Sequence, residues 1–199
     1  DRCQSAGIPI VQFNRVQERS RFSSVTTDNY SGGAEIARHL ISEGYQSFGY
    51  IAGWQGASTQ RDREAGFCAI LAEYGFDLSF RAVGNFRSEQ AYKAARLLVS
   101  QKQRPEAVFV ANDAMALVVM DVLRHEADLA VPDDIAIVGY DDIPPAGWPS
   151  YDLTSFSQPA DEMVENIVSL LMRHIETEEM EPLQITINGS LKIRSSSKR

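Results

Sequence analysis

The sequence is short of positive charge. Its 199 residues hold 19 lysines and arginines against 27 aspartates and glutamates, so the formal net charge is −8 at pH 7. Contacts to nucleic-acid phosphates need a clustered positive surface. We therefore do not expect this chain, by itself, to bind duplex DNA.

Cysteines and long apolar runs are equally scarce. The two cysteines, Cys3 and Cys68, show no metal-binding or redox spacing, so we expect two free thiols in a reducing cytosol. No stretch approaches the roughly 18 consecutive apolar residues of a membrane helix. These absences predict a cytoplasmic protein with no membrane contact.

Motifs of catalysis and of cofactor binding are also missing. The sequence contains no G-x-S-x-G elbow, no GxxxxGK phosphate loop and no dinucleotide fingerprint. None of its three histidines has metal-ligand spacing with a cysteine, a histidine or a carboxylate. We predict no catalytic residues, no metal and no cofactor, and a binding module is favoured over an enzyme.

The segment 106–142 shows how the chain is built. Two continuous apolar runs, Ala107–Val110 and Ile135–Val138, flank a helical pattern at 113–125. Apolar runs without alternation are typical of strands buried on both faces, and two such strands joined by a helix form a parallel unit.

The same alternation continues through the chain, so the predicted class is α/β with doubly wound parallel sheets. The last two predicted strands, 183–188 and 191–194, are joined at Gly189-Ser190, as in a β-hairpin. Other strands are expected at 7–13, 48–53, 80–83 and 153–156, with helices at 31–42 and 160–176.

Polar or aromatic side chains follow five of the predicted strands: Asn14, Trp54, Phe86, Asn112 and Asp141. In open parallel sheets, ligands bind beyond the carboxyl ends of the strands. The pattern therefore predicts a small-molecule site.

The candidate residues suit a polyhydroxylated ligand. The guanidinium of Arg63 donates to adjacent hydroxyls, the carboxylate of Asp141 accepts from them, and Asn112 does both. Arg61 lies two residues before Arg63 on the predicted helix, so the two should point in different directions. Asp142 is expected to cap the following turn.

Several segments together resemble the LacI/GalR family of bacterial transcriptional regulators. They are SSVTTDNYSGGAEIARHLISEGY, IAG…STQRDREAGF, VFVANDAMAL, VPDDIAIVGYDDIP and LTSFSQPADEM followed by LKIRSSS. The resemblance runs from Gly7 to Ser197, with the motifs in the family's order. It implies the effector-binding part, similar in fold to periplasmic sugar-binding proteins.

That fold has two α/β subdomains joined by three crossovers. The expected division is 1–26 with 156–182 for an amino-terminal subdomain, and 27–155 with 183–199 for a carboxyl-terminal one. Before GIPIV the family has further βα units, a hinge helix and a DNA-binding headpiece. The resemblance therefore implies a fragment whose amino-terminal subdomain is incomplete and which meets operator DNA only through the missing headpiece.

Carried over by position, the resemblance places ligand contacts at Arg63, Asn112 and Asp141, with Phe86 packing on the ligand. Asn14 and Gln158 would approach from the other subdomain or the hinge. Asn14 stands where several members have an acidic residue, and Ala160 is small where some have an aromatic one. These departures bear on the identity of the effector, for which we expect a sugar.

Two other functions remain open at this point. The alternative is a periplasmic-type sugar-binding protein of a transport system, which shares the N-D-x-M-A strand end. Asp142, where those relatives usually have glycine, and the segments 153–159 and 191–197 favour the regulator. A sugar-modifying hydrolase is disfavoured, because no acid/base pair stands at a credible spacing.

A homodimer is also expected. The predicted helix 114–123 carries more apolar residues than one buried face requires, and the loop 144–148 adds Trp148, an aromatic of the type enriched at interfaces. The family resemblance points to the same surfaces.

Overall fold

The computed structural model describes residues 8–17, 20–177 and 181–199, so Cys3 lies outside the described part. The chain divides into two compact units. Unit 1 consists of Asp1–Asp28 and Gln158–Gly189, and unit 2 of Asn29–Ser157 and Ser190–Arg199. The chain therefore crosses between the units three times.

Unit 2 is built on a six-stranded sheet in the order β4-β3-β5-β6-β7-β9. Neighbouring strands run parallel, except that β9 is antiparallel to β7. The strands are β3 (Phe48–Ala52), β4 (Leu78–Val83), β5 (Ala107–Val110), β6 (Ala136–Asp141), β7 (Thr154–Ser157) and β9 (Ser190–Lys192).

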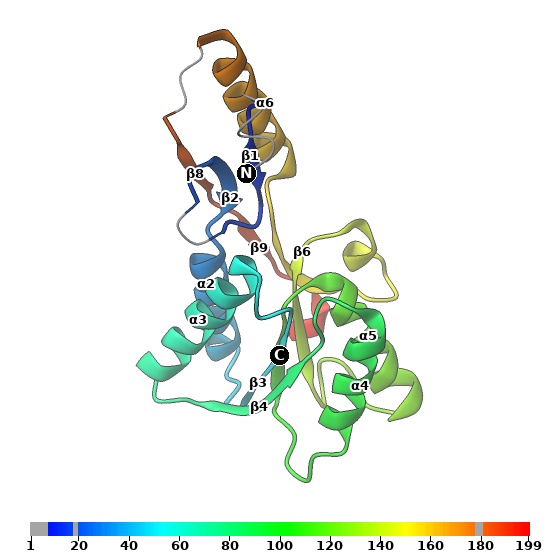
Figure 1. Cartoon of the computed structure of the whole chain (residues 1–199). Helices are drawn as coiled ribbons and strands as arrows, with labels where there is room; N and C mark the ends of the chain where they lie inside the picture. Colours follow the sequence, from blue (N-terminus) through cyan, green and yellow to red (C-terminus); the bar gives the residue numbers. More distant parts are fainter. Residues whose placement is uncertain (1–7, 18–19, 178–180) are drawn as a thin grey trace. The chain divides into compact units, whose positions relative to one another are not determined.

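Helices cover both faces of this sheet, as Figure 1 shows. On one face α2 packs on α3, and on the other α4 packs on α5. Their bounds are α2 (Asn29–Ser42), α3 (Ser58–Glu73), α4 (Ser88–Val99) and α5 (Asp113–Glu126), with short 3-10 turns η1 (Pro144–Gly147) and η2 (Ser195–Ser197). The predicted doubly wound α/β class is confirmed.

The core of unit 2 explains the continuous apolar runs. Every residue of β3 and β5 is buried, because helices lie on both sides of these strands. Phe109 lies at the centre, with its ring edge-on to Tyr50 and Phe67 at centroid distances of 5.1 and 5.2 Å. Such pairs add to the stabilisation that burial of the rings already gives.

The strand order reverses between β3 and β5. From β3 the chain moves outward to β4, and after β5 it moves the other way through β6 and β7. In open α/β sheets this reversal leaves a crevice beyond the carboxyl ends of the two strands. Those ends carry Gly53-Trp54 and Ala111-Asn112.

In the described residues of unit 1, a three-stranded parallel sheet in the order β1-β2-β8 packs against the helix α6. Val25 and Ile187 of the sheet pack against Met163 and Leu170 of the helix, and all four are buried. The elements are β1 (Val11–Phe13), β2 (Ser23–Thr27), β8 (Gln184–Ile187) and α6 (Ala160–Thr177).

The two last strands do not form the expected hairpin. β8 pairs with β2 of unit 1, whereas β9 pairs with β7 of unit 2. Gly189-Ser190 is a crossing between units rather than a turn, so residues 183–189 belong with unit 1, in contrast to the expected division. Each strand pairs with a partner far away in sequence, which a local turn signal does not reveal.

The apolar surplus of α5 is smaller than the sequence suggests. Most of its apolar side chains cover the sheet, whereas Leu117 and Val118 are half-buried and Ala114 is exposed. Trp148, by contrast, is 56% exposed.

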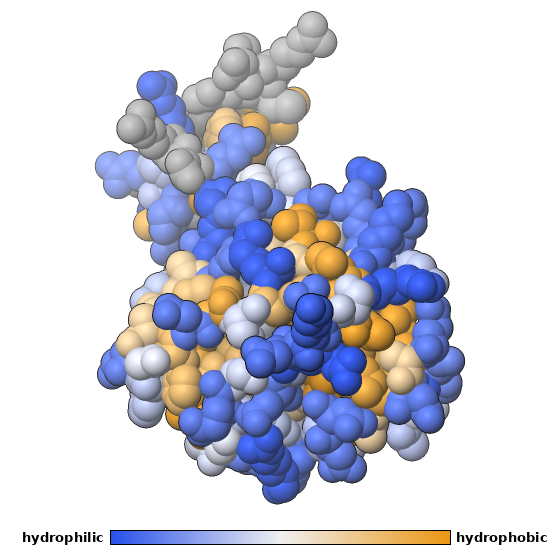
Figure 2. All heavy atoms as spheres, turned by 90° about the horizontal axis from the view of Figure 1, so that it is seen from below, coloured by the Kyte–Doolittle hydropathy of each residue, from blue (hydrophilic) through white to orange (hydrophobic). Residues whose placement is uncertain are grey.

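Figure 2 views the molecule from the end where the parallel strands begin, and there polar and apolar side chains are interspersed.

Two glycines let α2 and α3 touch backbone to backbone. A Cβ on Gly33 would lie 2.1 Å from the carbonyl oxygen of Arg63, and one on Gly66 would lie 2.0 Å from that of Tyr30. Real Cβ atoms do not approach so closely, so only glycine permits this packing. The close approach also fixes the position of Arg63.

We expect Gly33→Ala to lower the free energy of unfolding by about 1–3 kcal/mol, because the added methyl group forces the two helices apart. Gly147→Ala is the matched control, since its Cβ would meet nothing nearer than 3.7 Å. Urea denaturation followed by circular dichroism measures both. Equal stability of the two variants would contradict the backbone-contact explanation.

Candidate functional site

Arg63 is the centre of the site in unit 2. The residue is only 2% exposed, and its guanidinium donates three hydrogen bonds within unit 2. Nε donates to Asn29 Oδ1 at 2.8 Å, Nη1 to the carbonyl oxygen of Ala111 at 2.7 Å, and Nη2 to Asp141 Oδ1 at 3.3 Å. The guanidinium carbon lies 3.6 Å from the ring centroid of Tyr140, a cation–π contact.

The contact with Asp141 is an ion pair of unequal burial. The Arg63 side chain is 3% exposed and the Asp141 side chain 28%. Asp141 ends β6 with φ 110°, a conformation that side-chain-bearing residues rarely adopt. A buried cation therefore holds a carboxylate that still reaches the surface of unit 2, where it can accept hydrogen bonds from a ligand.

Arg61 points elsewhere, as expected from its spacing. Its Nη1 donates to the carbonyl oxygens of Gln55 and Gly56, at 3.3 and 3.2 Å, in the loop after β3. The two arginines of α3 thus have separate tasks: Arg61 braces a loop and Arg63 anchors the site.

Asp142 does not cap the following turn as expected. Its Oδ1 accepts from Arg194 Nη2 at 2.7 Å, and its backbone N–H donates to Ser155 Oγ at 3.0 Å. Asp142 has φ 52°, so two consecutive non-glycine residues are left-handed here. The two neighbouring carboxylates consequently bind different arginines.

Asn112 stands at the carboxyl end of β5 and begins α5. Its side-chain Oδ1 accepts from the backbone N–H of Met115 at 3.1 Å, which makes it the N-cap of the helix. The expected donor and acceptor pair is thus partly used, because capping occupies the oxygen. The amide NH₂ is the part of Asn112 with most capacity for a ligand.

Phe86 stands after β4 with φ 57°, and its ring lies on Gly53 at the end of β3. A Cβ on Gly53 would come within 2.0 Å of the Phe86 ring, so glycine is required beneath it. Trp54 is 55% exposed, and its own ring covers Gly56. The two glycines leave room for two aromatic rings, which lie at the ends of the adjacent strands β3 and β4.

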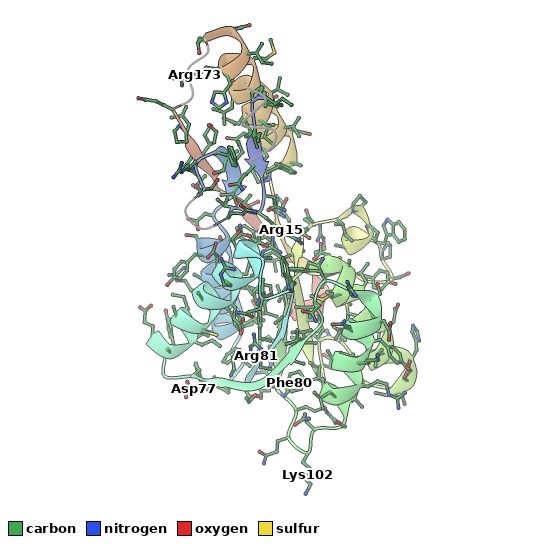
Figure 3. All side chains as sticks on the ribbon, viewed as in Figure 1. Arg15, Asp77, Phe80, Arg81, Lys102 and Arg173 are labelled. Atoms are coloured by element: carbon green, nitrogen blue, oxygen red, sulfur yellow. The ribbon has the colours of Figure 1, made fainter. Side chains whose placement is uncertain are left out.

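A polar network fixes Gly53. The fully buried Gln60 accepts from the N–H of Gly53 and from the hydroxyl of Tyr50, and its amide donates to Glu64 at 2.9 Å. Arg81, labelled on β4 in Figure 3, donates to both oxygens of Glu64. This chain of bonds ties α3 to β3 and β4 next to the site.

The two remaining candidates lie in unit 1. Asn14 follows β1 with φ 62°; its N–H donates to the carbonyl of Val25, and its own carbonyl accepts from the Thr26 hydroxyl, both at 2.8 Å. Gln158 Oε1 accepts from the Thr27 hydroxyl at 2.9 Å. Their predicted part in ligand binding stays a prediction.

Asp113 is a buried carboxyl that sequence reasoning passed over. The residue is 0% exposed; Oδ1 accepts from Ser155 Oγ at 2.7 Å and Oδ2 from the N–H of Ile143 at 2.9 Å. Burial raises the pKa of this carboxyl to about 7, against the opposing effect of the two hydrogen bonds. The charges of Asp141 and Asp142 raise it further.

Other partners of the site were also not foreseen. The side chain of Asn29 accepts from Arg63. The ring of Tyr140 lies against the Arg63 guanidinium. Neither has a local signal in the sequence, because both act through contacts with residues more than 30 positions away.

Within the described residues, no group of three or more histidine, cysteine, aspartate or glutamate side chains is arranged to hold a metal ion. Within the same part of the chain, none of the helices is long and apolar enough to cross a membrane.

The family model described as a periplasmic binding protein-like domain matches residues 37–197. The HTH-type transcriptional repressor PurR of Photorhabdus laumondii is 34% identical over 192 residues, which is 95% of this chain and 56% of that protein. The repressor of the same name from Photobacterium profundum is 30% identical, over 98% of this chain and 59% of that protein.

Two solved structures of transcriptional regulators are similar to this chain over nearly all of its length. The transcriptional regulator CelR, solved in complex with cellobiose, is 32% identical with a TM-score of 0.89, over 98% of this chain and 60% of that chain. A LacI transcriptional regulator from a Rhodococcus species is 26% identical with a TM-score of 0.90, over 98% and 72%. The chain spans less than three fifths of the length of the two curated repressors.

The carboxyl of Asp113 predicts a pH dependence of stability. Its pKa in the folded state, about 7, lies above the ordinary value of 3.8, so the folded state keeps a proton that the unfolded state releases. Its contribution to the free energy of unfolding is therefore full below pH 4 and is lost as the pH rises to about 7. The loss is on the order of 4 kcal/mol.

Asp113→Asn should remove this slope, because the amide does not titrate. Urea denaturation from pH 4.5 to 8 measures it, with the exposed Asp133→Asn as the matched control. The control should keep the wild-type slope. Parallel curves for wild type and Asp113→Asn would show that Asp113 does not titrate in this range.

Proposed function

The chain belongs to the periplasmic binding protein-like domain family, as the effector-binding region of a LacI/GalR-type regulator, and from this premise we propose that it senses a neutral sugar at the Arg63–Asp141 site. In this proposal the sugar binds beyond the carboxyl ends of β3, β5 and β6. The role is that of a binding module and not of an enzyme.

The ion pair of Arg63 with Asp141 carries the proposal. Three of the five guanidinium N–H groups are used within unit 2, which leaves two to donate to a ligand. The partly exposed Asp141 carboxylate accepts from hydroxyls. An acceptor and donors held side by side in this way match the vicinal hydroxyls of a sugar.

The surrounding groups favour a sugar over a charged ligand. Phe86 supplies a flat apolar wall for the C–H face of a sugar ring, and the Asn112 amide donates. A phosphorylated sugar needs a second cation, and the guanidinium of Arg61 is turned to a loop. The similar regulator CelR was solved with cellobiose, which supports a sugar of this type.

The full-length protein, in this proposal, regulates transcription. The curated relatives named above are repressors, which favours a regulator over the alternative of a transport-system binding protein. Operator DNA would be bound by a headpiece outside the present sequence, since this chain carries a net charge of −8. Effector binding would shift the population between two arrangements of the subdomains.

We expect unit 2 to form the homodimer contact. Between α4 and α5 lies an open cavity of about 440 Å³, where half-buried Val118 and partly exposed Tyr92 present apolar surface beside charged groups. Exposed Trp148 follows η1. Aromatic residues within a polar rim are typical of protein interfaces. The cavity is lined by Tyr92, Val118, Asp121, Val122, His125 and Glu126.

Removal of the ligand-facing groups should abolish most sugar binding. A thermal-shift screen of neutral sugars and purines on the full-length protein, starting with cellobiose, identifies the ligand. Calorimetry then compares Asp141→Ala and Arg63→Ala with wild type. Each variant removes one member of the ion pair and its hydrogen bonds to ligand hydroxyls, so we expect a loss of roughly 2–4 kcal/mol, or about 30- to 1000-fold in affinity.

Arg61→Ala is the control for loss of a cation from the same helix, and it should bind normally. Circular dichroism of each variant excludes unfolding as the cause. If both site variants bind within about threefold of wild type, the site assignment is wrong. If the best ligand is a nucleobase, the site stands but the sugar proposal falls.

A charge placed in the α4–α5 cavity should break the dimer. Val118→Asp buries an unpaired carboxylate in the proposed interface, so we expect its dimer dissociation constant to rise at least roughly 30-fold. Val83→Asp is the matched control, because Val83 is already 44% exposed on β4. Sedimentation equilibrium of the full-length protein measures both; a wild-type monomer would refute the dimer outright.

A further inference from the structure

The carboxyl of Asp113 lies directly beneath the corner formed by Asp141 and Asp142. Its Oδ2 accepts from the N–H of Ile143, the residue that follows the corner. Its Oδ1 accepts from the Ser155 hydroxyl, and the same hydroxyl oxygen accepts from the N–H of Asp142. One buried side chain thus holds the corner at two successive backbone N–H groups, once directly and once through Ser155.

The corner needs such support. Asp141 and Asp142 have φ values of 110° and 52°, and neither is glycine. Left-handed conformations of this kind persist only where the surrounding structure enforces them. Arg194 holds the Asp142 side chain, with Nη2 2.7 Å from Oδ1. The corner is therefore anchored at the backbone by Asp113 and at the side chain by Arg194.

Capping of α5 does not explain Asp113. The N-cap of this helix is Asn112, whose side chain accepts from the N–H of Met115. The chain also makes room for the carboxylate, since a Cβ on Gly139 would lie 2.1 Å from Asp113 Oδ1. Asp113 is thus a fully buried acid that does not cap the helix and for which Gly139 leaves space. It must therefore have another role.

We propose that Asp113 is a positioning residue of the effector site, which holds the Asp141–Asp142 corner so that the Asp141 carboxylate faces Arg63. Its role rests on the proposed function of that pair. Asp113 itself does not contact the ligand. It sets the direction of the carboxylate that does.

Protonation of Asp113 would change this support. The charged groups around it are Asp141 and Asp142 from β6, Arg63 of α3, which pairs with Asp141, and Arg194, which pairs with Asp142. In the ionised form both oxygens of Asp113 accept. In the protonated form one oxygen must donate, so its bond with Ser155 reverses and the hydroxyl proton of Ser155 turns away.

The neutral acid also accepts more weakly from the Ile143 N–H, because hydrogen bonds to a charged acceptor are the stronger ones. The corner is then less firmly held. Since burial places the pKa of Asp113 at about 7, this change falls within the neutral range. Effector affinity should decrease as the pH falls from 8 to 6.

Asp113→Asn is the variant that tests the proposal, because the amide resembles the protonated acid. Its oxygen accepts from Ile143 and its NH₂ donates to Ser155. Calorimetry with cellobiose as the probe, at pH 6 and pH 8, should show wild type binding about three- to tenfold more weakly at pH 6. The variant should bind equally at both values, at the weaker level, and Asp133→Asn should follow wild type.

A second measurement needs no ligand. In the wild-type protein, the amide proton of Ile143 and the carboxyl carbon of Asp113 should titrate in NMR spectra with one common midpoint near pH 7. In Asp113→Asn, the Ile143 amide should not titrate there. An Ile143 amide that stays constant in wild type, or an unchanged affinity profile in Asp113→Asn, overturns the proposal.

The two measurements separate the possible failures. If cellobiose does not bind the wild type, the sugar with the largest thermal shift replaces it as the probe. If no sugar binds, the proposed function fails, and the Ile143 titration alone decides whether Asp113 holds the corner. If Asp113→Asn does not fold, the wild-type titration still decides it. A merely structural Asp113 would change stability but leave the pH profile of affinity unchanged.

Discussion

The site of unit 2 depends on one buried guanidinium. Arg63 donates to the start of α2 at Asn29, to the end of β5 at Ala111 and to the end of β6 at Asp141. Loss of this buried guanidinium would be costly, because each carbonyl and carboxylate oxygen that it bonds would lose a hydrogen-bond donor. The same bonds that stabilise the unit therefore align the group that we propose binds the effector. Stability and binding share the same atoms.

Close packing brings these atoms together. Gly33 and Gly66 let α2 and α3 meet at the backbone, which fixes the backbone position of Arg63. Gly53 leaves room for the ring of Phe86. On the other side, Gly139 admits Asp113 beneath the strained corner of Asp141. Each glycine has a different neighbour, but at each position a Cβ would prevent a contact that the site needs.

The alternation of apolar runs and helical patterns predicted the α/β class, and the strand ends near Asn112 and Asp141 lie where the sequence placed them. These features are local, since burial on both faces makes a continuous run and a polar break ends it. The pairing of β8 with β2 and of β9 with β7 was not predictable in this way, because strand partners are distant in sequence. The predicted hairpin at Gly189-Ser190 failed for that reason.

The same distinction holds for the candidate site. Arg63 and Asp141 were named as a donor and an acceptor, and the structure brings them within 3.3 Å. Asp113 was missed, because nothing in the sequence separates a buried carboxyl after a strand from a solvated one. Asn29 and Tyr140 were missed because their tasks exist only once Arg63 lies between them. A role that depends on a distant partner needs the fold before it can be assigned.

The central claim is that a ligand binds at the Arg63–Asp141 pair. A crystal structure of the full-length protein with the sugar that raises its melting temperature most tests this claim directly. Ligand hydroxyls should lie within hydrogen-bond distance of the Asp141 carboxylate and of Arg63, with the sugar ring against Phe86. Sugar density elsewhere, such as in the α4–α5 cavity, with no ligand atom near Asp141, would contradict it.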